Sequence, residues 1–172
     1  MAGRRERRAL MRMDARFKAD PQSGAVYDGD IRYMMIRPDA LMGIFARLAD
    51  DARADALNAF KASITEHGGR SAATNVAAAG PDKLLDVIEA TAPALGWGIW
   101  RFERRDGPFS LIVENSPFAA GATFDGPACH PICGMAGAVA SHIRGVRYTA
   151  RETQCVASGA PYCRFEIEPD PL

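Results

Sequence analysis

The four cysteines of this 172-residue chain, at positions 129, 133, 155 and 163, all lie in its C-terminal part. An even number of clustered cysteines indicates either two disulfides or a metal site. Disulfides form in exported proteins, but the N-terminus lacks the apolar run of a secretory signal, so we expect a cytoplasmic protein with reduced thiols. Clustered thiols in the cytosol are more often metal ligands, although a reduced cysteine buried in a core needs no metal.

The composition is that of an ordinary folded protein. Hydrophobic residues make up 48% of the chain and charged residues 24%, which excludes a disordered or fibrous chain. The length suggests one domain, or one domain with a short appendage. No segment approaches the run of about 18 apolar residues that a membrane-spanning helix needs, so we expect no membrane span.

The charges are balanced overall but unevenly distributed. The chain has 21 basic and 21 acidic residues. Residues 1–18 contain seven basic and two acidic side chains, a net charge of +5, which leaves −5 on the remainder. A basic arm could contact nucleic acid or anionic lipid, but a solvated terminal extension is the simpler interpretation. The acidic body argues against a nucleic-acid partner.

The first half of the chain reads as a hairpin followed by helices. Asp28-Gly29 predicts a hairpin turn, with its second strand at 31–36. Pro38 suits the first position of a helix, because proline has no N–H to leave unpaired there. Two further helices are predicted, one over 51–67 that Gly68-Gly69 ends and one over 82–95.

The second half alternates strands with one helix. Strands are predicted at 98–104 and 109–113 around an Asp106-Gly107 turn, then a helix at 131–143 and strands at 146–155 and 162–167. Because the strands come in adjacent pairs, we expect the α+β class, with an antiparallel sheet and helices packed on it. The expected parts are a basic extension at 1–23, a hairpin and helical part at 24–95, and a C-terminal domain at 96–172.

Three cysteines and one glutamate are predicted to meet near the C-terminus. Cys133 falls in the first turns of the predicted helix, while a hairpin brings Cys155 and Cys163 together. Glu152 lies three residues before Cys155. Three thiolates and one carboxylate can complete a tetrahedral Zn²⁺ shell, and thiolates favour zinc over calcium or magnesium.

Two neighbouring residues are alternatives to Cys133 as the fourth ligand. Cys129 lies four residues earlier, a spacing that would align both thiols on one helix, but Pro131 is expected to begin the helix between them. His130 is the other alternative. On the residues alone, the choice stays open.

Three segments, ENSPFAAG, HPICGMAG and RETQCVASGAPYCRFEIEP, resemble the V4R (4-vinyl reductase) domain family. That family includes small hydrocarbon-binding proteins and the sensory modules of activators that respond to phenol- or toluene-like effectors. The resemblance covers residues 96–168. The segment GAVYDGDIRYMMIRPDALMGIF also resembles the dimerising N-terminal half of those sensors, which implies a homodimer.

The resemblance also implies a set of site residues. Carried over from the family, a structural Zn²⁺ is expected at Cys133, Glu152, Cys155 and Cys163. Four protein ligands leave no open position for catalysis. A ligand pocket is expected between the sheet and the helices, although plain core packing is the alternative for each lining residue. The candidates are Trp97, Trp100, Phe102, Phe109, Leu111, Val113, Phe118 and Phe124.

The leading expectation is a stand-alone zinc-containing protein that binds a small hydrophobic or aromatic molecule as a sensor or carrier. Some members of the family are associated with bacteriochlorophyll formation, so one alternative is an accessory or 4-vinyl reductase-like protein that binds a tetrapyrrole. The chain has no GxGxxG nicotinamide fingerprint, so the residues themselves predict no reductase. The third alternative is a structural dimer or interaction module.

Overall fold

The computed structural model describes residues 17–103 and 109–171, which fall into two compact units divided between residues 37 and 38. Most of the predicted basic extension, and the predicted turn at Asp106-Gly107, lie outside the described residues. Within those residues, every helix is too short or too polar to cross a bilayer.

The first unit is a three-stranded antiparallel sheet with the strand order β1-β2-β3. It consists of β1 (Lys18–Asp20), β2 (Ala25–Asp28) and β3 (Ile31–Tyr33). The predicted hairpin is confirmed: Asp28 pairs with Ile31, and Gly29 in the turn has a φ of 58°, a conformation that glycine adopts readily. Strand β1 was not predicted, because Lys-Ala-Asp has none of the β-branched or aromatic residues that favour strands.

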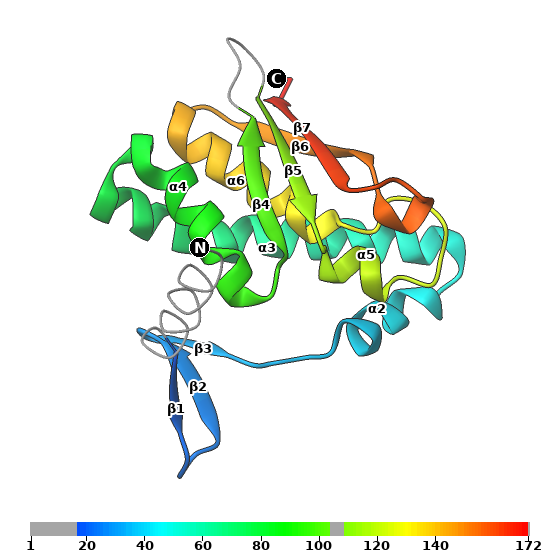
Figure 1. Ribbon diagram of the computed structural model, residues 1–172, viewed down its shortest axis with the longest axis horizontal. Helices are drawn as coiled ribbons and strands as arrows, with labels where there is room; N and C mark the ends of the chain where they lie inside the picture. Colours follow the sequence, from blue (N-terminus) through cyan, green and yellow to red (C-terminus); the bar gives the residue numbers. More distant parts are fainter. Residues whose placement is uncertain (1–16, 104–108, 172) are drawn as a thin grey trace, which may run out of the picture. The chain divides into compact units, whose positions relative to one another are not determined.

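The second unit is built on a four-stranded antiparallel sheet with the order β4-β5-β7-β6 (Figure 1). Its strands are β4 (Ile99–Glu103), β5 (Phe109–Glu114), β6 (Tyr148–Gln154) and β7 (Cys163–Pro169). Along β5 and β7 the paired side chains Leu111 and Phe165 are both fully buried. This architecture confirms the predicted α+β class.

Helices cover one face of this sheet. They are α2 (Pro38–Ala46), α3 (Asp50–Ala79), α4 (Pro81–Thr91), α5 (Pro117–Gly121) and α6 (His130–Arg144), with short 3₁₀ turns η1 (Pro93–Leu95) and η2 (Val156–Ser158). Helix α6 packs against β6 and β7 on one side and against α3 on the other (Figure 1). Nearly every residue from Pro131 to Ala140 is therefore buried. The small side chains predicted for this helix let the sheet, α6 and α3 pack closely on one another.

Helix α3 is longer than the sequence predicts. We expected Gly68-Gly69 to end it, but the helix continues to Ala79. The two glycines lie where α6 packs: a Cβ on Gly68 would stand 2.5 Å from Met135 Cε, and one on Gly69 would stand 3.4 Å from Ala138 Cβ. The space that Gly68 leaves for Met135 lets the two helices pack closely, which offsets the unfavourable helix propensity of glycine at this position.

Candidate functional site

Four buried side chains converge where α6 begins and the β6–β7 hairpin turns. Cys129, Glu152, Cys155 and Cys163 each offer a ligand atom, and these atoms all lie within 4.8 Å of one another. The Sγ atoms of Cys129 and Cys163 are 3.6 Å apart, and those of Cys163 and Cys155 are 4.0 Å apart. Sulfurs bound at 2.3 Å to a tetrahedral Zn²⁺ are separated by about 3.8 Å. The spacing of the thiols therefore fits such an ion.

A β-bulge aims two of these ligands at the same point. In a regular strand Glu152 and Cys155, three residues apart, would face opposite sides of the sheet. The β6–β7 register shifts between Glu152 and Gln154, so the extra residue turns the strand and lets both side chains reach the cluster. Cys163, the first residue of β7, completes the hairpin's contribution.

The structure brings together three of the four predicted ligands, but with Cys129 in place of Cys133. Helix α6 starts at His130, with Pro131 in its first turn, so Cys129 is the residue that directly precedes the helix. Its backbone N–H donates to Oε2 of Glu152 at 2.9 Å. Cys133 lies one turn further into the helix, outside the cluster. The position of Pro131 was the signal for this, because proline favours the first turn.

Cys133 instead belongs to a neighbouring polar pocket of about 510 Å³. Burial, as the main cause, raises the pKa of its thiol to about 12, so it stays a protonated and unreactive thiol at neutral pH. His130 lines the same pocket, and burial lowers its pKa. Its Nδ1 is buried and has no hydrogen-bond partner among the described residues. Neither Cys133 nor His130 belongs to the four-residue cluster.

The charges within the cluster favour a bound cation. Burial, the largest cause, raises the pKa of Glu152 to about 8, and its Oε1 has no hydrogen-bond partner among the described residues. Hydrogen bonds from Cys129 and Cys163 hold the pKa of Cys155 well below its ordinary value, while donation to Cys155 raises the pKa of Cys129. A buried carboxylate oxygen without a partner is costly. A divalent cation would satisfy it and replace the shared thiol protons, so the residues present fit a metal ion.

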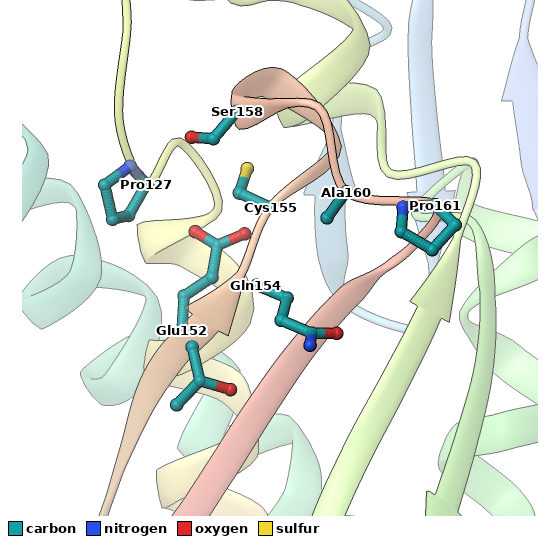
Figure 2. Close-up of a pocket in the computed structure, with 8 residues that line it drawn as sticks. Pro127, Glu152, Gln154, Cys155, Ser158, Ala160 and Pro161 are labelled. Carbon is teal, nitrogen blue, oxygen red and sulfur yellow. The ribbon is translucent and has the colours of Figure 1, made fainter.

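The cluster is reachable from a surface pocket of about 290 Å³. Figure 2 shows the carboxylate of Glu152 pointing toward Cys155 at this pocket, with Ser158 on the side of the cysteine sulfur. Pro127, Ala160 and Pro161 form other parts of the lining. An ion can therefore approach two of the four ligands from the surface.

The eight predicted ligand-lining residues all belong to the hydrophobic core or pack directly against it. A run of ring contacts passes through five of them and joins Phe45, Phe60, Phe118, Trp97, Trp100, Phe102, Phe109 and Tyr148. None of the eight lines either pocket described above. The assignment of these residues as the lining of a ligand site therefore stays a prediction.

Comparison with known sequences supports the resemblance. Residues 109–169 match the model of the V4R domain. The Bacteriochlorophyll synthase 23 kDa chain of Cereibacter sphaeroides (strain ATCC 17023) is 37% identical over 62 residues. That match covers 36% of this chain and 30% of the relative, so it spans less than a third of the relative's length.

Solved structures share the fold over most of the chain. The phenol-responsive sensory domain of the transcription activator PoxR, determined with phenol, matches with a TM-score of 0.76 at 20% identity, covering 95% of this chain and 89% of that one. A vinyl-4-reductase family protein from Methanocaldococcus jannaschii matches with a TM-score of 0.57 at 16% identity, covering 81% of this chain and 85% of that one. A trafficking protein particle complex subunit 3 from Naegleria fowleri, covalently bound to palmitic acid, matches with a TM-score of 0.51 at 12% identity. The match covers 78% of this chain and 95% of that one. At these identities the similarity concerns the fold.

Proposed function

We propose that this chain, in which residues 109–169 match the V4R domain model, binds a small hydrophobic molecule of aromatic character and a structural Zn²⁺, acting as a sensor or carrier. The observation that carries the proposal is the cluster of Cys129, Glu152, Cys155 and Cys163, whose ligand atoms lie within 4.8 Å. Three thiolates and a carboxylate are costly to bury together unless a metal ion or shared protons neutralise their charge.

Zinc would have a structural role here. The four ligands come from the start of α6, from β6 and its end, and from the start of β7, so one ion would tie these elements together. All four positions of a tetrahedral shell would be filled by protein atoms, which leaves no position for a reacting water.

The hydrophobic ligand is proposed to bind where the aromatic rings converge on Phe118. Its ring meets those of Trp97 and Phe60 edge-on, with centroids 5.2 Å and 6.2 Å away. Support comes from the phenol-bound sensory domain, whose fold this chain shares. Aromatic side chains with a few polar groups for orientation are the usual lining of such sites. One polar group is already engaged, because Trp100 Nε1 donates to the carbonyl oxygen of Trp97.

Intrinsic fluorescence tests the ligand proposal directly. The chain has two tryptophans, Trp97 and Trp100, and both belong to the run of ring contacts. Titration with phenol, a dimethylphenol and toluene should change their emission saturably and raise the melting temperature, as expected for a ligand that binds only the folded state. If none of these probes produced a saturable change or a thermal shift, the proposal of an aromatic ligand would be overturned.

A second candidate ligand is a tetrapyrrole. The observation that favours it is the 62-residue match to the Bacteriochlorophyll synthase 23 kDa chain. In this alternative the chain is an accessory or 4-vinyl reductase-like protein that presents a chlorophyll precursor. Addition of a protochlorophyllide-type pigment should then shift the absorbance of the pigment, and phenols should not compete with it.

We further propose that two copies of the chain associate through the segment 31–36. Met34 is 80% exposed and Met35 is 93% exposed, with Ile31 and Ile36 also exposed beside them. A run of exposed apolar side chains marks an interaction site, and the resemblance to dimerising sensors makes a second copy the expected partner. Sedimentation should show a dimer that Met35→Glu weakens. A wild-type monomer at high protein concentration would contradict this, and would leave a structural dimer module without support.

A further inference from the structure

Ser116 connects the candidate metal cluster with the aromatic core. It lies two residues after the end of β5 and directly before α5, and its side chain is buried, with 2% of the residue exposed. Its Oγ lies 3.1 Å from Sγ of Cys129 and accepts a hydrogen bond from the N–H of Ala119 at 3.4 Å. The hydroxyl is thus held between the first turn of α5 and a cluster sulfur.

The direction of the Ser116–Cys129 hydrogen bond follows from the chemistry of a metal thiolate. A cysteine that binds zinc has lost its proton, so its sulfur can only accept. The Ser116 hydroxyl has one proton, and because its oxygen already accepts from Ala119, that proton is available for Sγ of Cys129.

Each of the other two sulfurs also has a donor, but a backbone one. The N–H of Val156 donates to Sγ of Cys163 at 3.4 Å, and the backbone of Ala128 forms a hydrogen bond to Cys155. Three thiolates and a carboxylate around Zn²⁺ leave a buried net charge of −2, which hydrogen bonds of this kind disperse. Among these three donors, only the one from Ser116 can be removed by changing a side chain.

Ser116 directly precedes helix α5, and Phe118 lies two residues further along the chain. Phe118 inserts between Trp97 and Phe60, and α5 also contacts η2, the turn that follows Cys155. At its other end, Gly121 packs so closely on α2 that a Cβ there would stand 2.5 Å from the carbonyl oxygen of Pro38. Because α5 is a single short helix, a displacement of the Phe118 ring would also move Ser116 at its N-terminus.

We infer that Ser116 is a positioning residue that donates a hydrogen bond to the metal-bound Cys129 thiolate and couples the packing of the aromatic core to the metal centre. This inference deepens the proposed function and rests on it. It gives a V4R sensor a physical route by which a molecule among the rings is registered at the metal-bound hairpin.

The test uses Co²⁺ in place of zinc, because its sulfur-to-metal charge-transfer absorption reports directly on the thiolates. Ser116→Ala should shift this absorption and weaken Co²⁺ binding by about 10-fold or more, the usual effect of losing such a partner. Ser110→Ala is the matched control: Ser110 is also buried, with 3% exposed, but it accepts a hydrogen bond from Arg164 and donates one to Glu103. It should leave the absorption unchanged.

A second variant separates the hydrogen bond to sulfur from helix capping. Ser116→Gly also lacks the hydroxyl, but glycine is nearly as good as serine at the position before a helix. If loss of the cap caused the effect, Ser116→Gly would restore the wild-type absorption and affinity, and that result would overturn the inference. A shift shared by Ser116→Ala and Ser116→Gly supports it.

The coupling is tested by Phe118→Leu, with Phe102→Leu as its control. Phe102 is buried in the same core but lies on β4. Phe118→Leu should alter the Co²⁺ absorption, and should alter it less in the Ser116→Ala background. Equal effects of the two leucine variants would contradict the coupling. A wild-type chain that binds no Co²⁺ would instead overturn the metal proposal and this inference together.

Discussion

The backbone N–H of Cys129 donates to Oε2 of Glu152 at 2.9 Å. This hydrogen bond ties the start of α6 to β6 at the point where both supply a ligand. It occupies one oxygen of the carboxylate and leaves Oε1, which has no hydrogen-bond partner among the described residues, free to bind a cation. The same contact therefore fixes the helix and orients the ligand.

Glu152→Gln should affect the metal-bound and metal-free chains in opposite directions. Glutamine keeps an oxygen for the N–H of Cys129 but lacks the negative charge that a cation requires. We expect the zinc affinity to fall at least 10-fold. With a chelator present at neutral pH, the free energy of unfolding should rise by about 1 kcal/mol, because Glu152, whose pKa burial raises to about 8, must take up a proton on folding, whereas glutamine is already neutral.

The control for this substitution is Glu89→Gln. Oε1 of Glu89 likewise accepts a backbone N–H, that of Phe102 at 2.6 Å, but it lies on α4, away from the cluster. Zinc affinity, measured by competition with a chromophoric chelator, should be unchanged in this variant. Equal losses of affinity in the two variants would show that Glu152 is not a ligand.

Gly134→Ala should destabilise the fold through the contact between α3 and α6. A Cβ at position 134 would overlap the carbonyl oxygen of Lys61, which is backbone and cannot move aside. Overpacking of this kind costs about 1–3 kcal/mol. Denaturant unfolding monitored by circular dichroism measures it.

Gly69→Ala is the comparison, because its Cβ would stand 3.4 Å from Ala138 Cβ, an ordinary contact, in a helical residue. Alanine is more favourable than glycine in helices by about 0.5–1 kcal/mol. This variant should therefore be as stable as wild type or slightly more stable. An equal loss of stability in both alanine variants would contradict the claim that α6 packs on α3 most closely at Gly134.

Lys61→Met should expose the outer edge of the sheet. Nζ of Lys61 donates to the carbonyl oxygen of Ala150 at 3.0 Å and lies 3.4 Å from Oγ1 of Thr149, so it covers β6, which ends the strand order. Removal of a charged donor from a partly buried carbonyl costs about 1–3 kcal/mol. Amide hydrogen exchange in β6 should accelerate, whereas Lys83→Met, on an exposed position of α4, should leave it unchanged. Unaltered exchange in Lys61→Met would contradict the role of this lysine.

Local patterns predicted much of the fold and three of the four cluster residues. Paired strands with turn residues between them identify the hairpin that joins Cys155 to Cys163, and Glu152 follows from its distance to Cys155 along the chain. The bulge that aims Glu152 and Cys155 together could not be predicted, because it depends on the register with β7. The prediction of the ligand pocket stays open, because the predicted lining residues are packed against one another.

Two expectations depended on where a helix begins or ends, which local signals do not fix. Choosing between Cys129 and Cys133 required knowing the first residue of α6 to within a single position, and the structure places Cys129 in the cluster and Cys133 outside it. Gly68-Gly69 was interpreted as a helix end, because the sequence does not show that α6 packs against these glycines.

The central claim is that Cys129, and not Cys133, is a metal ligand. Measuring the zinc content of variants in which one cysteine at a time is replaced by serine tests it most directly. Cys129→Ser and Cys133→Ser are matched changes of buried cysteines one helical turn apart, and serine preserves the start of the helix at position 129. The account predicts close to one zinc per purified wild-type chain, close to one in Cys133→Ser, and less than half in Cys129→Ser. Zinc retained in Cys129→Ser and lost in Cys133→Ser, or absent from the wild-type chain, would contradict it.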